Sequence, residues 1–114
     1  MLVEKFGWEK MGRMIEENAG KMARNENYLF RISGIQMVGK LKSVISSSSL
    51  KSIWKDVFET LRNDPIANVR FNLIKCYIEI RNKLSEAEKR NYNKSLEGMK
   101  KDKDNDVAFF ALQI

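Results

Sequence analysis

The fold is decided by residues 64–72, which read Asp64-Pro65-Ile66-Ala67-Asn68-Val69-Arg70-Phe71-Asn72. The carboxylate of Asp64 is able to cap a helix by accepting hydrogen bonds from free backbone N–H groups. Pro65 suits the first helical position, because its φ is already helical and its missing N–H would have no partner there. Apolar side chains then follow at helical spacing, at Val69, Leu73, Tyr77 and Ile80. The stretch therefore predicts a helix that begins at Asp64-Pro65.

Related stretches occur about forty residues to either side. Arg31 lies 39 residues before Arg70, and Ala108 lies 38 residues after it. Each of the three follows polar turn residues and one apolar residue, in order Phe30, Val69 and Val107. Later apolar positions repeat in the same register: Ile32, Phe71 and Phe109, then Ile35, Ile74 and Leu112. A recurrence of this length is typical of α-solenoids of the HEAT class, which bind other proteins rather than carry out chemistry.

A second helix is predicted before each of these, over residues 8–23, 50–62 and 86–101. The middle one has a complete apolar stripe of Leu50, Ile53, Trp54, Val57, Phe58 and Leu61, and the Ser46–Ser49 run supplies its N-cap. The third opens with Ser85-Glu86-Ala87-Glu88, a capping-box spacing, and has a thin apolar face of Ala87, Tyr92, Leu96 and Met99. We expect an all-α solenoid of three antiparallel helix pairs in one domain. Its repeats cover about 7–45, 46–83 and 84–114.

The composition fits a folded domain, with 43% hydrophobic and 32% charged residues among 114. No run approaches the roughly twenty apolar residues of a membrane span. The order of residues at the N-terminus is not that of a signal peptide, and Cys76 is the single cysteine, which excludes an intrachain disulfide. We expect a cytoplasmic location, with the nucleus as an additional one.

Catalytic chemistry has little support in the sequence. The chain has no histidine, the commonest general base and metal ligand. It also has no glycine-rich phosphate loop and no paired cysteines. Asp102, Asp104 and Asp106 resemble part of a calcium loop but lack its glycine and its final glutamate, so we interpret them as a turn with helix caps. We predict a non-enzyme without catalytic residues, cofactor or metal.

The residues that invite ligand sites are better explained as core. Trp8 and Trp54 lie in helical stripes and are expected to pack inside or between repeats. Cys76 is expected to be a small buried side chain. The methionines at 11, 14, 22 and 37 fit a soft repeat core better than a metal site.

With the units in register, several stretches resemble the C-terminal end of the scaffold (A) subunits of protein phosphatase 2A. The most specific is residues 64–72; the others are Leu2–Gly7, Asn27-Tyr28-Leu29-x-Arg31 and Asp106-Val107-x-x-Phe110-Ala111. The resemblance covers nearly the whole chain and implies the last three HEAT repeats of a horseshoe, with Met1–Phe6 ending a helix of a missing repeat. The first unit departs from the pattern with Asn25-Glu26 in place of Asp-Pro. The third has Ala108 in place of a base and ends early at Ile114.

The resemblance implies that the turns within each helix pair bind the phosphatase catalytic subunit, a serine/threonine phosphatase, without any small-molecule substrate or membrane. Carried over by position, the residues assigned to this contact are Tyr28, Arg31 and Ile66. We add their neighbours Leu29, Pro65, Ala67 and Asn68, together with Asn105 and Asp106 in the corresponding turn of the third unit. For Tyr28 and Ile66, local packing is an equally open alternative. Arg31 and Arg70 share one repeat position, where a guanidinium could instead bind turn carbonyls or an acid of the next unit, such as Asp64. We assign Asp64 and Arg70 to such a structural ladder, and leave Arg31 open between ladder and partner contact.

Two alternatives stay open. The chain could be a HEAT module of another adaptor or transport protein, with a different partner on the same turns. It could also bind nucleic acid through the segment 31–62, where six bases face two acids, an excess of four positive charges within a net charge of +6. No dense basic run stands alone, so nucleic-acid binding is the weaker hypothesis.

Overall fold

In the computed structural model the described residues, which are 10, 13, 14, 17–43 and 45–114, form helices joined by short turns and contain no strand. Residues 17–23 are helical. The later elements are α2 (Tyr28–Leu41), α3 (Ser47–Leu61), α4 (Ala67–Ile80), the 3₁₀ helix η1 (Arg81–Lys83), α5 (Glu86–Leu96), the 3₁₀ helix η2 (Glu97–Lys101) and α6 (Asn105–Ala111). The predicted all-α class is therefore confirmed.

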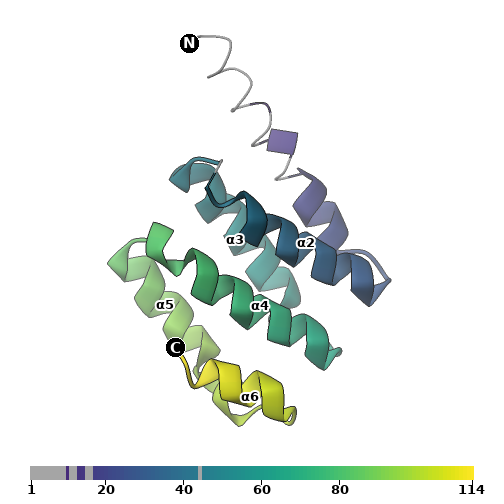
Figure 1. Ribbon diagram of the computed structural model, residues 1–114, viewed down its shortest axis with the longest axis vertical. Helices are drawn as coiled ribbons and strands as arrows, with labels where there is room; N and C mark the ends of the chain where they lie inside the picture. Colours follow the sequence, from purple (N-terminus) through teal and green to yellow (C-terminus); the bar gives the residue numbers. More distant parts are fainter. Residues whose placement is uncertain (1–9, 11–12, 15–16, 44) are drawn as a thin grey trace.

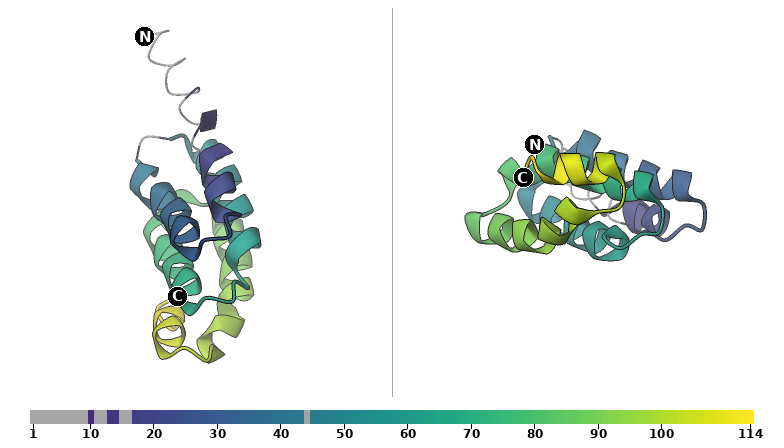
Figure 2. Two further views of the ribbon diagram at one scale, coloured as in Figure 1. Left: turned by 90° about the vertical axis from the view of Figure 1, so that its right-hand side faces the viewer. Right: turned by 90° about the horizontal axis from the view of Figure 1, so that it is seen from below.

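The helices lie in two layers, and the chain passes from one layer to the other at each turn (Figure 1). One layer contains α2, α4 and α6 side by side; the other contains the helical residues 17–23, α3 and α5 (Figure 2). The turns before α2, α4 and α6 lie along one edge, and the loops before α3 and α5 lie along the opposite edge. This arrangement places equivalent turns next to one another in space.

Helix α3 forms because its apolar stripe and its cap agree. Ser46 is the N-cap, and its hydroxyl oxygen accepts a hydrogen bond from the backbone N–H of Ser49 at 3.1 Å. The helix begins at Ser47, three residues earlier than predicted, because the serine run continues the helix after its cap. All six predicted stripe residues are buried. The side that they form faces the other layer and makes the centre of the core.

Helix α4 does not begin at Asp64-Pro65. Its N-cap is Ile66, which makes no side-chain capping bond, and its first residue is Ala67. The Asp64 carboxylate accepts instead from the backbone N–H of Ile66 at 2.9 Å, which closes a turn in front of the helix. Pro65 lies within that turn. The predicted helix is correct, and its predicted cap and first residue are each wrong by two residues.

The third helix pair begins as predicted and then departs from the prediction. The capping box at Ser85 is complete, with Glu88 bonding back to the backbone N–H of Ser85 at 3.1 Å. The α-helix ends at Leu96, however, and residues 97–101 continue as 3₁₀ helix. Leu96 and Met99 are buried and Tyr92 is partly buried, whereas Ala87 is exposed and does not belong to the apolar face.

Aromatic side chains fill the core between α3, α4 and α5. The Trp54 ring stacks on Tyr77 at a centroid distance of 5.9 Å and meets the edge of Tyr92 at 6.0 Å. The hydroxyl of Tyr77 donates to the side-chain oxygen of Asn93 at 2.6 Å, which satisfies its polar end. Trp54 and Cys76 are buried, as predicted; Trp8 lies outside the described residues.

The first helix pair packs closely through Gly34 on α2. A Cβ at this position would lie 3.0 Å from Cβ of Met22 and 3.3 Å from the carbonyl oxygen of Ala19. Glycine is therefore what lets α2 approach the helical residues 17–23. Of the methionines predicted for the core, Met22 and Met37 are partly buried; Met11 lies outside the described residues.

One methionine predicted for the core and three apolar side chains of the repeat register are exposed. Met14 is exposed, and so is Phe30, although its repeat equivalents Val69 and Val107 are fully buried. Phe109 on α6 and Leu112 at its C-cap are also exposed, because no described element covers that side of the last helix. No helix among the described residues is long and apolar enough to cross a membrane.

Candidate interaction site

The turn ridge, which we define as residues 25–27, 64–66 and 102–104, is built from three turns of one conformation. In each turn the first side chain accepts a hydrogen bond from the backbone N–H two residues later. The three bonds are Asn25 Oδ1 to Asn27 N at 2.8 Å, Asp64 Oδ1 to Ile66 N at 2.9 Å, and Asp102 Oδ1 to Asp104 N at 2.9 Å. These Asx turns recur at offsets of 39 and 38 residues, so the sequence repeat is also a repeat of backbone geometry.

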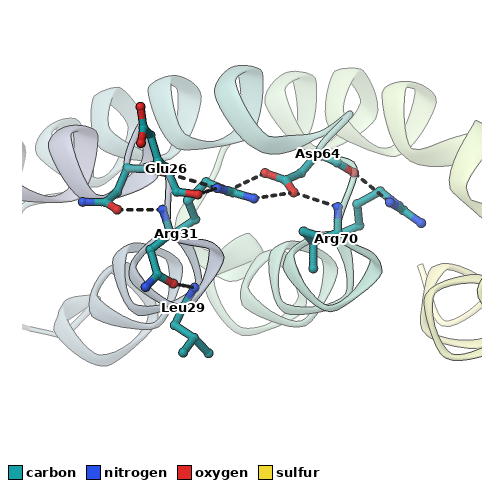
Figure 3. A network of polar contacts seen from close by, with 8 residues as sticks. Glu26, Leu29, Arg31, Asp64 and Arg70 are labelled. Carbon is teal, nitrogen blue, oxygen red and sulfur yellow. Dashed lines mark hydrogen bonds and ion pairs between the residues drawn. The ribbon is translucent and has the colours of Figure 1, made fainter.

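The first and second turns are joined by Arg31 (Figure 3). Its Nε lies 2.7 Å from Oδ2 of Asp64, and its Nη2 donates to Oδ1 of the same carboxylate at 3.1 Å. Its Nη1 donates back to the carbonyl oxygens of Asn25 and Glu26, at 3.0 and 2.9 Å. Only 13% of the Arg31 side chain and 5% of the Asp64 side chain are exposed. One guanidinium therefore fastens its own turn to the next one.

Arg70 joins the second and third turns in the same way. Its Nε and Nη2 each donate to Asp102 at 2.9 Å, and its Nη1 donates to the carbonyl oxygen of Asp64 at 2.7 Å. The hydrogen bond from Arg70 holds the pKa of the Asp102 carboxyl below its usual range. The equivalent residue of the third unit is Ala108, which has no guanidinium, so the series ends there.

These contacts form a continuous ladder: Arg31 binds Asp64, the main chain of Asp64 binds Arg70, and Arg70 binds Asp102. The ladder position was expected for Asp64 and Arg70, and was one of two alternatives for Arg31. The structure places the Arg31 side chain within the ladder. Its charge is therefore directed at Asp64 rather than at solvent, and we do not include it among the exposed contact residues.

Sequence reasoning missed two members of this network. Asp102 was considered only as one acid of a cluster, and Asn25 only as a departure from the Asp-Pro pattern. The signal was present, since Asn25, Asp64 and Asp102 are spaced like the two arginines. Asp104 does cap a helix, accepting from the backbone N–H groups of Asp106 and Val107 at 3.0 and 3.1 Å.

Apolar side chains are exposed beside the ladder. Tyr28 and Leu29 open α2 and are 41% and 56% exposed, and Ile66 at the N-cap of α4 is 37% exposed. Leu29 points away from the ladder (Figure 3). Pro65 and Asn68 are exposed and Ala67 is partly buried. The structure therefore brings most of the sequence-predicted contact residues to neighbouring helix starts along one edge.

The third unit differs from the prediction. Asn105 and Asp106 are exposed, but they lie in the first turn of α6 and not in the preceding turn. The reason is that Asp104 caps the helix, so that Asn105 is already helical. The third turn presents Lys103 between two acids and has no exposed apolar side chain.

The bases of segment 31–62 do not form one surface. Arg31 is held in the ladder, Lys40 lies on α2, and Lys51 and Lys55 lie on α3 in the other layer. Lys51 is also paired with Glu88 at 3.5 Å. A duplex needs a continuous basic stripe. Three of these bases, Lys51, Lys55 and Arg62, do line one hollow, but they share it with the acids Glu59 and Glu88.

The described residues contain no group of three or more His, Cys, Asp or Glu side chains placed to hold a metal ion. Comparison of the sequence with models of known protein families gives no match, and comparison with curated proteins gives none either.

Proposed function

We propose that this chain is a HEAT-repeat scaffold that binds another protein through its turn ridge and the adjoining helix starts. The observation that carries this proposal is the ladder itself. Two guanidinium groups and two carboxylates form ion pairs that hold successive turns at fixed positions, at one edge of the molecule. A preorganised row of turns lowers the entropy cost of binding a partner that contacts several of them at once.

Exposed apolar side chains next to this rigid row support the same proposal. Tyrosine is enriched among the residues that dominate interface energies, because it is rigid and has both an apolar ring and a hydroxyl. Tyr28 and Ile66 stand at neighbouring helix starts, where one partner surface could contact both. A charged side chain at Ile66 would have to be desolvated in such an interface.

The partner that the resemblance suggests is the catalytic subunit of protein phosphatase 2A, which would be positioned by this chain and not altered chemically. The test is capture of the purified catalytic subunit by immobilised chain. We expect Tyr28→Ala combined with Ile66→Asp to abolish capture while the helical circular dichroism stays unchanged.

The matched control is Phe109→Ala combined with Leu112→Asp. Phe109 lies in α6 and Leu112 at its C-cap; they are 60% and 63% exposed, and they receive the same kinds of substitution outside the turn ridge and away from Tyr28 and Ile66. We expect this variant to capture the catalytic subunit as well as the unaltered chain. Equal capture by all three proteins would show that Tyr28 and Ile66 do not form the contact.

A further inference from the structure

The turn ridge is hollowed between its second and third turns. This hollow has a volume of about 520 Å³ and is open to solvent. One wall is the end of α3 and the turn that follows, which contribute Arg62, Asp64 and Pro65. The other is the end of η2 and the third turn, which contribute Lys101, Asp102 and Lys103. The ladder residue Arg70 also lines it.

The acids of the hollow are already neutralised. Asp64 is held by Arg31, which lies outside the hollow, and Asp102 is held by Arg70. Both carboxylates are nearly buried, with 5% and 11% of the side chain exposed. They therefore offer little negative charge to a ligand that enters.

The remaining bases carry charge without a partner. Arg62, Lys101 and Lys103 are exposed, and none of them makes an ion pair with another described residue. The hollow thus presents three positive charges that are not engaged in ion pairs with described residues, on both of its walls. Such a concave arrangement attracts anions and raises their association rate.

We propose that this basic hollow binds an acidic segment of a partner polypeptide, one that carries several Asp or Glu carboxylates. The bases are shared between two walls instead of converging on one point, which suits carboxylates spaced along a chain. Because the bases lie on the turn ridge, this inference rests on the proposed function for the location of the binding surface. The charge argument does not depend on which partner binds there. Binding is expected to weaken with salt, because exposed charges are screened.

The direct test uses a fluorescein-labelled peptide of alternating glutamate and serine, with fluorescence anisotropy at low and high salt. We expect Lys101→Glu combined with Lys103→Glu to weaken binding about tenfold at low salt and to flatten the salt dependence. The matched control is Lys75→Glu combined with Lys83→Glu. It changes the net charge by the same amount, in the middle of α4 and at the end of η1, and neither residue lines the hollow.

An equal loss of binding in both variants would overturn the proposal, since general attraction to a basic protein would then explain the binding. No loss in the Lys101/Lys103 variant would overturn it as well. Circular dichroism melts of both variants establish that they are folded. A labelled single-stranded RNA of equal charge is the third probe, and RNA binding with the same variant dependence but tighter than the peptide would assign the hollow to nucleic acid instead.

A second measurement separates this inference from the proposed function. Association rates of the phosphatase catalytic subunit are compared for the unaltered chain and both charge variants. If the subunit is captured at the same rate by all three and the peptide does not discriminate between them, the inference fails while the proposed function stands. If the subunit is never captured but the peptide discriminates, the proposed function fails while the inference stands.

Discussion

Replacing Asp64 by asparagine tests what the ladder contributes to stability. Asparagine keeps a side-chain oxygen for the backbone N–H of Ile66, so the turn itself is retained. It removes the negative charge opposite Arg31, whose side chain is 13% exposed. Breaking a buried ion pair costs about 3–5 kcal/mol when the remaining charge has no other partner. Arg31 still has two carbonyl acceptors, so we expect the free energy of unfolding to fall by about 2 kcal/mol.

The chain contains its own control in the pair Arg24–Asp56. Its guanidinium and carboxylate are joined by two hydrogen bonds of 2.6 and 3.0 Å, but the two side chains are 55% and 44% exposed. Exposed pairs contribute about 0.2–1 kcal/mol, so Asp56→Asn is expected to cost about 0.5 kcal/mol. If contact distance alone set the stabilisation, the exposed pair at 2.6 Å would contribute at least as much as the Arg31–Asp64 pair at 2.7 Å. The comparison therefore separates burial from contact length.

Urea denaturation followed by circular dichroism measures both costs. With a typical slope for a chain of this size, the Asp64→Asn midpoint should fall by about 1 M. In a chain that already carries Arg31→Met, Asp64→Asn should cost less than half as much, because the charge that it strands is gone. The reasoning is refuted if Asp56→Asn is as destabilising as Asp64→Asn, or if the Arg31→Met background makes no difference.

Three further outcomes are expected. The pKa of Asp102 is lowered by its hydrogen bond from Arg70, so the stabilisation is complete above the unfolded value of about 3.9 and is lost as pH falls through the lower folded value. The urea midpoint should thus be steady from pH 7 to about 5 and fall below about 4, with a shallower fall in Asp102→Asn. Burial raises the pKa of the Cys76 thiol to about 12, so a thiol reagent at pH 8 should react with the unfolded chain but not with the folded one. Gly34→Ala should destabilise by about 1–2 kcal/mol, because its Cβ would press on Met22 and on backbone, whereas Gly98→Ala meets nothing within 4 Å and should change stability by less than about 0.5 kcal/mol.

The fold was predictable from the sequence wherever one helix contains both its apolar stripe and its cap. The α3 stripe is periodic over four turns and its serine cap is adjacent, so both were recognised. The start of α4 was misplaced because the Asp64 carboxylate serves a turn and an arginine 33 residues away, which no local pattern reveals. Local capping rules assume that a side chain serves its own helix.

The candidate site was predictable to the extent that its positions repeat. The repeat register placed Arg31 and Arg70 at equivalent positions, which led to the prediction of a ladder. Asp102 was interpreted only with its neighbours Asp104 and Asp106, so its role as the partner of Arg70 was missed. For Phe30 the register suggested a similarity that the structure lacks. It made Phe30 equivalent to the buried Val69, although Phe30 is 51% exposed. Periodicity identifies which face of a helix is apolar, but it does not show whether another helix covers that face.

The ladder also affects how the molecule can deform. The polar contacts at the two edges of the molecule differ. Successive turns are joined by nearly buried arginine–carboxylate pairs at one edge. Near the opposite edge, the polar contacts between described units are a hydrogen bond of 3.2 Å from Lys42 Nζ to the carbonyl oxygen of Glu79 and the partly exposed Lys51–Glu88 pair. Under a bending load we expect the helices to separate at the edge opposite the ladder, while the turns joined by the ladder keep their spacing. The curvature of the layers can then change while the spacing between turns stays constant. A partner bound along the turn ridge would keep its contacts as the chain bends.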